Sequence, residues 1–162
     1  MSSAAHVWCA PVASETQGGC GCPPTEAPVP STGGVHHVFL AVNDLARSRP
    51  FYVALMPRLG YPGVWDAGGV IGFLSPGGSF WLKQADPRYA GETFSKDRVG
   101  LCEVAFRAES RAQVDGLARD VTGFGGKILD PPREYPEYVP GYYAVFFADP
   151  AGIKLELVHI PK

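Results

Sequence analysis

The sequence predicts an α+β fold built from two tandem βαβββ modules. Three observations support this: β-branched and aromatic runs of strand length, amphipathic segments of helix length, and a second half that repeats the order of the first. With 162 residues, 46% of them hydrophobic, the chain has the size of one domain and can bury a core.

The first module spans about residues 35–84. Residues 35–42 (VHHVFLAV) predict a strand that ends at two side chains suited to capping a helix. Residues 45–59 then carry apolar side chains at helical spacing. Pro50 and Pro57 count against this helix: Pro50 could lie in its first turn if the helix starts late, and Pro57 should kink or shorten its end. Short strands are expected at 70–74 and 79–83.

The second module, about residues 99–160, repeats this order. Residues 101–108 predict a strand, Ser110 caps a helix that runs to about Phe124, and Gly125 and Gly126 end it because glycine accepts a positive φ. Three further strands and a loop rich in proline and tyrosine are expected: a short strand at 128–129, the loop at 130–141, and strands at 142–148 and 153–160.

Overlaying the two halves supports the tandem repeat. One alignment sets His37 on Glu103 at the start of the first strand of each module. A second sets the turn at 75–78 on the turn at 149–152, and with it Leu82 on Glu156. Insertions in the second module explain why two alignments are needed.

Residues 1–34 predict a flexible or irregular tail. They are rich in Pro, Gly, Ser, Thr and Ala and lack an apolar period, so they cannot offset the entropy of ordering. Cys9, Cys20 and Cys22 lie here, and with Cys102 they are too few and too uneven for a disulfide framework. The Cys20 and Cys22 pair could hold a thiophilic metal or sense redox state; the alternative is incidental thiols in a solvated tail.

Charge and hydropathy exclude several partners. The net charge is −2, with Lys and Arg scattered, which gives no attraction for nucleic acid or anionic lipid. No stretch approaches the roughly 18 apolar residues that cross a bilayer, and no secretory signal is evident. We therefore expect a cytoplasmic protein whose partner is a small molecule.

Strand alternation places three ionisable side chains on corresponding faces. His37, Glu103 and Glu156 each alternate with apolar residues that take the core side of their strands. One imidazole and two carboxylates therefore lie on the same kind of face, one on each of three strands.

The runs that carry these residues resemble the signatures of the vicinal-oxygen-chelate superfamily. The opening signature is residues 37–48 (HVFLAVNDLARS) followed by 51–52 (FY), and the closing one is residues 142–156 (YYAVFFADPAGIKLE). The resemblance covers residues 35–159 and implies a glyoxalase-like fold, in which the two modules form a curved, half-closed mixed sheet around a metal and substrate cavity. The superfamily includes glyoxalase I, extradiol dioxygenases, fosfomycin-resistance transferases, methylmalonyl-CoA epimerase and metal-free bleomycin-binding proteins.

The resemblance implies a divalent metal on His37, Glu103 and Glu156. Glu103 stands where many relatives have histidine, and two carboxylates with one imidazole favour Mn, Mg, Fe(II), Ni, Co or Zn. By the overlay, Leu82 occupies the fourth-ligand position and cannot bind metal. The implied three-ligand site keeps open positions for two neighbouring substrate oxygens.

Glu103, Glu156, Arg107 and Tyr143 are the candidate catalytic residues. Arg107 could bind a substrate carboxylate or phosphate through its planar fork. Tyr143 ends a loop, residues 130–143, that could close over the ligand. Each has a structural alternative: Glu103 could pair with Arg107 or a lysine, and the loop tyrosines could serve packing alone.

The leading hypothesis is a divalent-metal-dependent enzyme of lyase, isomerase or dioxygenase type that acts on a small molecule with adjacent oxygens. Resemblance alone implies a homodimer. The alternative is a metal-free protein of the bleomycin-resistance type, which would bind or sequester a small molecule by stacking it on Trp65, Trp81 and the tyrosines. A third hypothesis is a metal or thiol sensor based on Cys20 and Cys22.

Overall fold

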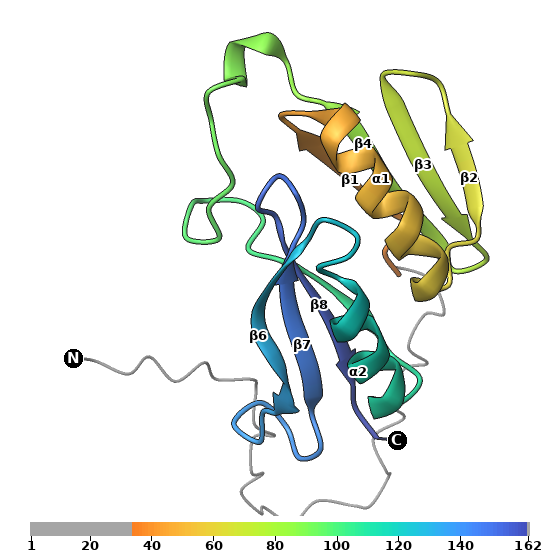
Figure 1. Ribbon diagram of the computed structural model, residues 1–162, viewed down its shortest axis with the longest axis vertical. Helices are drawn as coiled ribbons and strands as arrows, with labels where there is room; N and C mark the ends of the chain where they lie inside the picture. Colours follow the sequence, from red (N-terminus) through yellow and green to blue (C-terminus); the bar gives the residue numbers. More distant parts are fainter. Residues whose placement is uncertain (1–33, 162) are drawn as a thin grey trace, which may run out of the picture. The chain divides into compact units, whose positions relative to one another are not determined.

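A computed structural model describes residues 34–161 of the chain, and the cysteine pair of the predicted sensor lies outside them. The described residues form a βαβββ unit twice in succession (Figure 1). The first unit contains β1 (His37–Val42), α1 (Leu45–Leu55), the 3₁₀ turn η1 (Met56–Leu59), β2 (Gly63–Asp66), β3 (Val70–Ser75) and β4 (Gly78–Gln84). The 3₁₀ turn η2 (Pro87–Tyr89) leads to β5 (Val104–Arg107), α2 (Arg111–Asp120), β6 (Lys127–Glu134), β7 (Tyr143–Ala148) and β8 (Lys154–His159).

Each unit forms its own four-stranded mixed sheet. The order is β1-β4-β3-β2 in the first sheet and β5-β8-β7-β6 in the second. The first strand of each unit runs parallel to the last, and the other neighbours are antiparallel. The predicted α+β fold of two tandem modules is confirmed.

Helix α1 begins and ends at polar and proline signals that the sequence carries. Asp44 caps it by accepting a hydrogen bond from the backbone N–H of Arg47. The helix does not start late, so Pro50 lies inside it, beyond the first turn where the sequence analysis could accommodate it. Pro57 falls in η1, where the α-helix has already ended, so the expected helix over 45–59 is an α-helix followed by a 3₁₀ turn.

Helix α2 starts as predicted and ends early. Ser110 accepts a hydrogen bond from the backbone N–H of Gln113. The helix stops at Asp120, short of Phe124, and Gly125 takes a φ of +92° in the turn that follows. No helix among residues 34–161 is long and apolar enough to cross a membrane.

Strand β6 is longer than the sequence indicated. Only residues 128–129 were expected as strand, yet β6 runs through Pro131 and Pro132 into the predicted loop. Its pairing with β7 is interrupted by register shifts on both sides of Asp130. Because β6 is an edge strand, prolines without an N–H are tolerated there.

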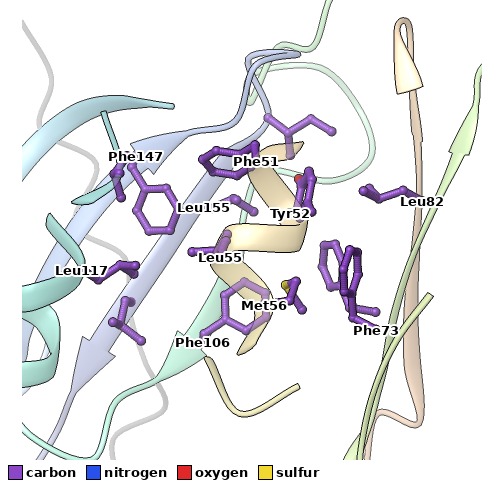
Figure 2. Packing of buried hydrophobic residues seen from close by; sticks show 14 of the residues in the cluster. Phe51, Tyr52, Leu55, Met56, Phe73, Leu82, Phe106, Leu117, Phe147 and Leu155 are labelled. Atoms are coloured by element: carbon purple, nitrogen blue, oxygen red, sulfur yellow. The ribbon is translucent and has the colours of Figure 1, made fainter. Parts of the chain in front are cut away.

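The two sheets share one hydrophobic core. Helix α1 lies between them, and Figure 2 shows its residues Phe51 and Leu55 directed toward Phe147 and Leu155 of the second module. Core residues from β1, β3, β4, β5, β7 and β8 belong to the same cluster. The opposite face of each sheet is turned away from this core, and by strand alternation that face carries His37 in the first sheet and Glu103, Arg107 and Glu156 in the second.

A buried hydrogen bond also links the modules. The Tyr52 hydroxyl of α1 donates to the Asp149 carboxylate at 2.9 Å, in the turn between β7 and β8. Asp149 also accepts from the backbone N–H groups of Ala151 and Ile153. Burial raises the pKa of Asp149, although these hydrogen bonds favour its ionised form.

Candidate metal and substrate site

Two carboxylates face the same side of the second sheet. Glu103 directly precedes β5, and Glu156 lies in the neighbouring strand β8. Ala105 pairs with Glu156 across these parallel strands. Because alternate residues of a strand share a face, both carboxylates lie on the side opposite the core, as alternation predicted.

Glu156 is a buried carboxylate that accepts a hydrogen bond from Tyr142. The residue is 2% exposed, and the Tyr142 hydroxyl donates to its Oε1 at 2.5 Å. Burial raises the pKa of Glu156; the Tyr142 hydrogen bond opposes that rise, and the negative charge of Glu103 adds to it. Sequence reasoning missed Tyr142 in this position.

Lys154 binds the other carboxylate. Its Nζ lies 2.6 Å from Oε2 of Glu103 and 4.3 Å from the centre of the Phe146 ring. Glu103 therefore forms an ion pair with a lysine, which was one of the predicted alternatives, and not with Arg107. The signal was present in the sequence, because Lys154 shares a strand face with Glu156.

The tyrosine-rich loop packs over this face. Tyr135 stacks on Tyr138 with ring centres 5.7 Å apart, and Tyr142 meets Tyr138 edge to face at 5.1 Å. The guanidinium of Arg133 lies 3.8 Å above the Tyr135 ring. Tyr135 is buried in a second small cluster with side chains of β7 and β8, so these tyrosines form a wall beside Glu156.

Tyr143, predicted to be catalytic, points to the helix side of β7. Its hydroxyl donates to Asp115 of α2 at 2.7 Å, and the Arg111 guanidinium lies over its ring. Adjacent residues of an extended chain point to opposite faces, so Tyr142 reaches Glu156 and Tyr143 does not. A catalytic role for Tyr143 stays a prediction.

Arg107 is exposed at the end of β5. Within residues 34–161 it makes no ion pair with a carboxylate. It lines a cavity of about 290 Å³ together with Tyr61 and Ser75. An unpaired guanidinium beside a cavity can bind an anion, as the sequence analysis proposed.

His37 lies on the first sheet. It is exposed and pairs in register with Ser79 of β4. A cavity of about 350 Å³ between β1 and β5 is lined by His36, His37 and Glu103, but not by Glu156. Two of the three predicted ligands therefore border one cavity.

The described residues of one chain do not assemble the predicted ligand set. Among residues 34–161, no three side chains of His, Cys, Asp or Glu lie close enough to hold a metal ion. His37 belongs to one sheet and Glu156 to the other, and both point away from the shared core.

The overlay placed the fourth-ligand position one residue too far along β4. In the two sheets Phe39 pairs with Trp81 just as Ala105 pairs with Glu156, so Trp81 is the counterpart of Glu156. Leu82 is buried in the core. A shift of one residue reverses the face of a strand side chain, and a tryptophan, like a leucine, provides no metal ligand.

The sequence and the fold agree with one family. The model of the Glyoxalase/Bleomycin resistance protein/Dioxygenase superfamily matches residues 34–157, and the chain belongs to this superfamily. It is 36% identical over 126 residues to the protein YqjT of Bacillus subtilis (strain 168), which covers 76% of this chain and 97% of YqjT.

Solved structures share the fold. A protein from Bacillus halodurans is 31% identical, with a TM-score of 0.67 over 79% of this chain and 96% of its own. A glyoxalase/bleomycin resistance protein from Albidiferax ferrireducens T118 is 26% identical, with a TM-score of 0.67 over 79% of this chain and all of its own. The fosfomycin resistance protein FosX of Listeria monocytogenes, 19% identical with a TM-score of 0.59 over 80% of this chain and 95% of its own, shares the fold alone.

Proposed function

We propose that this chain is a divalent-metal-dependent enzyme of the vicinal-oxygen-chelate superfamily. Its substrate is a small molecule with adjacent oxygens, and its reaction is of lyase, isomerase or dioxygenase type. The observation that carries this proposal is the pair of neighbouring carboxylates, Glu103 and Glu156, on the outward face of the second sheet.

The donor set suits a hard or borderline metal ion. Two carboxylates and the imidazole of His37 are ligands that Mn, Fe, Ni, Co and Zn accept. A carboxylate as buried as Glu156 is costly unless a cation or hydrogen-bond donors balance it. The metal would supply Lewis-acid stabilisation of negative charge on the substrate oxygens.

Side chains of this chain would prepare the site. Tyr142 holds Oε1 of Glu156 in place and leaves its other oxygen for the ion. Lys154 neutralises Glu103 until the ion replaces it. Arg107, which no described carboxylate engages, would bind an acidic group of the substrate.

A second copy of the chain would complete the ligand set. Within one chain His37 and Glu103 border one cavity, but Glu156 does not, and no three ligand side chains of the described residues come together. In a two-fold dimer, the first sheet of one copy can lie over the second sheet of its partner, and symmetry then creates two equal sites.

Metal titration tests the proposal. The protein is stripped with chelator and titrated with Mn, Fe(II), Co, Ni and Zn by calorimetry, beside His37→Ala, Glu103→Ala and Glu156→Ala. We expect near-stoichiometric binding of at least one metal and its loss in each variant. Asp115→Ala, which removes a carboxylate on the helix side of the second sheet, serves as the control and should bind like the wild type.

A metal-free binding function is the second candidate. Exposed aromatic side chains on the first sheet favour it, because stacking on them requires no ion. Absence of binding for every metal tested would overturn the enzyme proposal and leave this one.

A further inference from the structure

The outward face of the first sheet carries three aromatic side chains that touch one another. Trp81 of β4 lies between Phe39 of β1 and Trp65 of β2, with ring centres 6.4 Å and 5.6 Å away. Phe39 is 50% exposed and Trp65 is 48% exposed. We call these three residues the aromatic platform; by strand alternation it occupies the same face as His37.

The central ring of the platform is fixed in place. Its indole lies flat over Gly72 of β3, so close that a Cβ at this glycine would meet ring atoms at 2.4 to 2.7 Å. The indole Nε1–H donates to the hydroxyl of Ser79 at 2.7 Å. Because Gly72 lies against its ring and Ser79 accepts its hydrogen bond, Trp81 loses little conformational freedom when a ligand stacks on it. This favours binding.

A positive charge lies beside the platform. Nζ of Lys83 is 5.8 Å from the centre of the Phe39 ring, and Lys83 follows Trp81 on the same face of β4. Within the described part of the chain Lys83 forms no direct ion pair; Asp86, which borders the same cavity as Lys83, pairs with Arg88 instead. The face therefore combines flat apolar surfaces with an available cation.

We propose that the aromatic platform is a binding subsite for the planar ring of an aromatic carboxylate, with the acid directed toward Lys83. The two outer rings lie on either side of Trp81, tilted at 57° and 60° to the indole, and each is about half exposed. Stacking would supply the affinity, and the ammonium group would set the orientation. Because it identifies this ligand with the substrate, the inference rests on the proposed function; it assigns the carboxylate on the aromatic ring to Lys83 and leaves Arg107 for a different acidic group.

Binding of a defined probe tests the subsite without metal. In EDTA, 2-naphthoate and cyclohexanecarboxylate are titrated into the full chain by calorimetry, beside Trp65→Leu, Trp65→Phe and Lys83→Met. We expect 2-naphthoate to bind and the saturated acid to bind at least tenfold more weakly, because only a flat ring can stack. Trp65→Leu should weaken binding about tenfold, and Trp65→Phe should restore most of it.

Two controls separate this subsite from other effects. Lys83→Met should weaken 2-naphthoate about fivefold and leave uncharged naphthalene-2-methanol unaffected. Tyr89→Leu, which removes an exposed aromatic ring outside the platform, should bind 2-naphthoate like the wild type.

Equal binding of the aromatic and saturated acids, or no effect of Trp65→Leu, would overturn the inference. So would a loss of dimer in Trp65→Leu with no naphthoate binding in the wild type, because a second copy would then occupy the platform. These results leave the metal titration untouched, so the subsite and the proposed enzyme can fail separately.

Discussion

The two neighbouring tyrosines at the start of β7 have opposite surroundings. Tyr142 donates to the buried carboxylate of Glu156, whereas Tyr143 donates to Asp115 on the helix side of the sheet. Only the first hydroxyl can affect a metal bound by Glu156. The alternation of an extended chain therefore separates a residue that orients the Glu156 carboxylate from one that connects a helix to its sheet.

Tyr142→Phe should weaken manganese binding roughly tenfold, because a ligand that loses its orienting hydrogen bond binds less well. Tyr143→Phe should leave manganese affinity unchanged and lower the free energy of unfolding by about 1 kcal/mol. Calorimetric titration and urea unfolding of both variants measure these effects. A metal effect in Tyr143→Phe equal to that in Tyr142→Phe would show that this assignment is wrong.

Lys154→Met should tighten manganese binding about fivefold or more. The ammonium group pairs with Glu103 and must leave before an ion can use that carboxylate, and its removal also relieves charge repulsion. Lys127→Met, at the start of β6, is the matched control and should bind manganese like the wild type. Weaker binding in Lys154→Met would instead mean that the lysine supports the site.

Sequence alternation could assign the faces of His37, Glu103 and Glu156, since this needs only the period of a single strand. It could not place the Tyr142 hydroxyl on Glu156, and it offered Glu103 a lysine partner without choosing Lys154 among the lysines, because both contacts depend on the register between strands. The same limit explains the error at Leu82, where a shift of one residue exchanged the core face for the outward face.

At the scale of elements, the hydrogen bond from Tyr52 to Asp149 joins α1 to the turn between β7 and β8. Tyr52→Phe leaves a buried carboxylate with one donor fewer and should cost about 1–3 kcal/mol at pH 7. Urea unfolding of the variant and the wild type measures the loss. A cost near zero would show that the bond adds nothing to the joining of the modules.

The cost of Tyr52→Phe should depend on pH. Burial raises the pKa of Asp149, so its carboxyl binds a proton more tightly in the folded state than in the unfolded state. The protein therefore loses stability as the pH rises from the ordinary pKa of an aspartate to the higher pKa of Asp149 in the folded state. The Tyr52 bond favours the carboxylate and limits this loss. The difference between variant and wild type should therefore be small near pH 4 and grow toward neutral pH.

Gly126 lies where α2 returns to β6, against α1. A Cβ there would meet the Phe51 ring at 2.6 Å and the carbonyl oxygen of Ala148 at 2.9 Å. Gly126→Ala should therefore lower the free energy of unfolding by about 1–3 kcal/mol. Gly91→Ala, with no atom within 4 Å of its added Cβ, should change it by less than about 0.5 kcal/mol.

Local signals sufficed for most elements. Asp44 and Ser110 cap their helices as predicted, and the apolar runs form strands. Two elements contradicted local rules because tertiary structure overrides propensity: α1 contains Pro50, and β6 contains two prolines at the edge of its sheet.

For the whole molecule, the sequence predicted two tandem modules but not how they pack. Their helix-bearing faces share one core, which turns both site faces outward. That arrangement depends on contacts between distant residues, such as Phe80 with Phe106 at 5.7 Å, and no pattern within a module encodes them. The sequence therefore predicted each ligand on its own strand, but it did not predict that one chain fails to bring all three together.

The central claim is a metal site divided between two copies of the chain. His37→Ala lacks the ligand of the first sheet and Glu156→Ala lacks that of the second, so neither homodimer should hold metal. Unfolded together in equal amounts and refolded, they form mixed dimers in which one of the two sites is intact.

Metal analysis of this mixture is the most direct test. We predict about a quarter of the wild-type manganese content in the mixture and almost none in either variant refolded alone. A mixture as empty as its components, beside a wild type that binds manganese in full, would contradict the divided site.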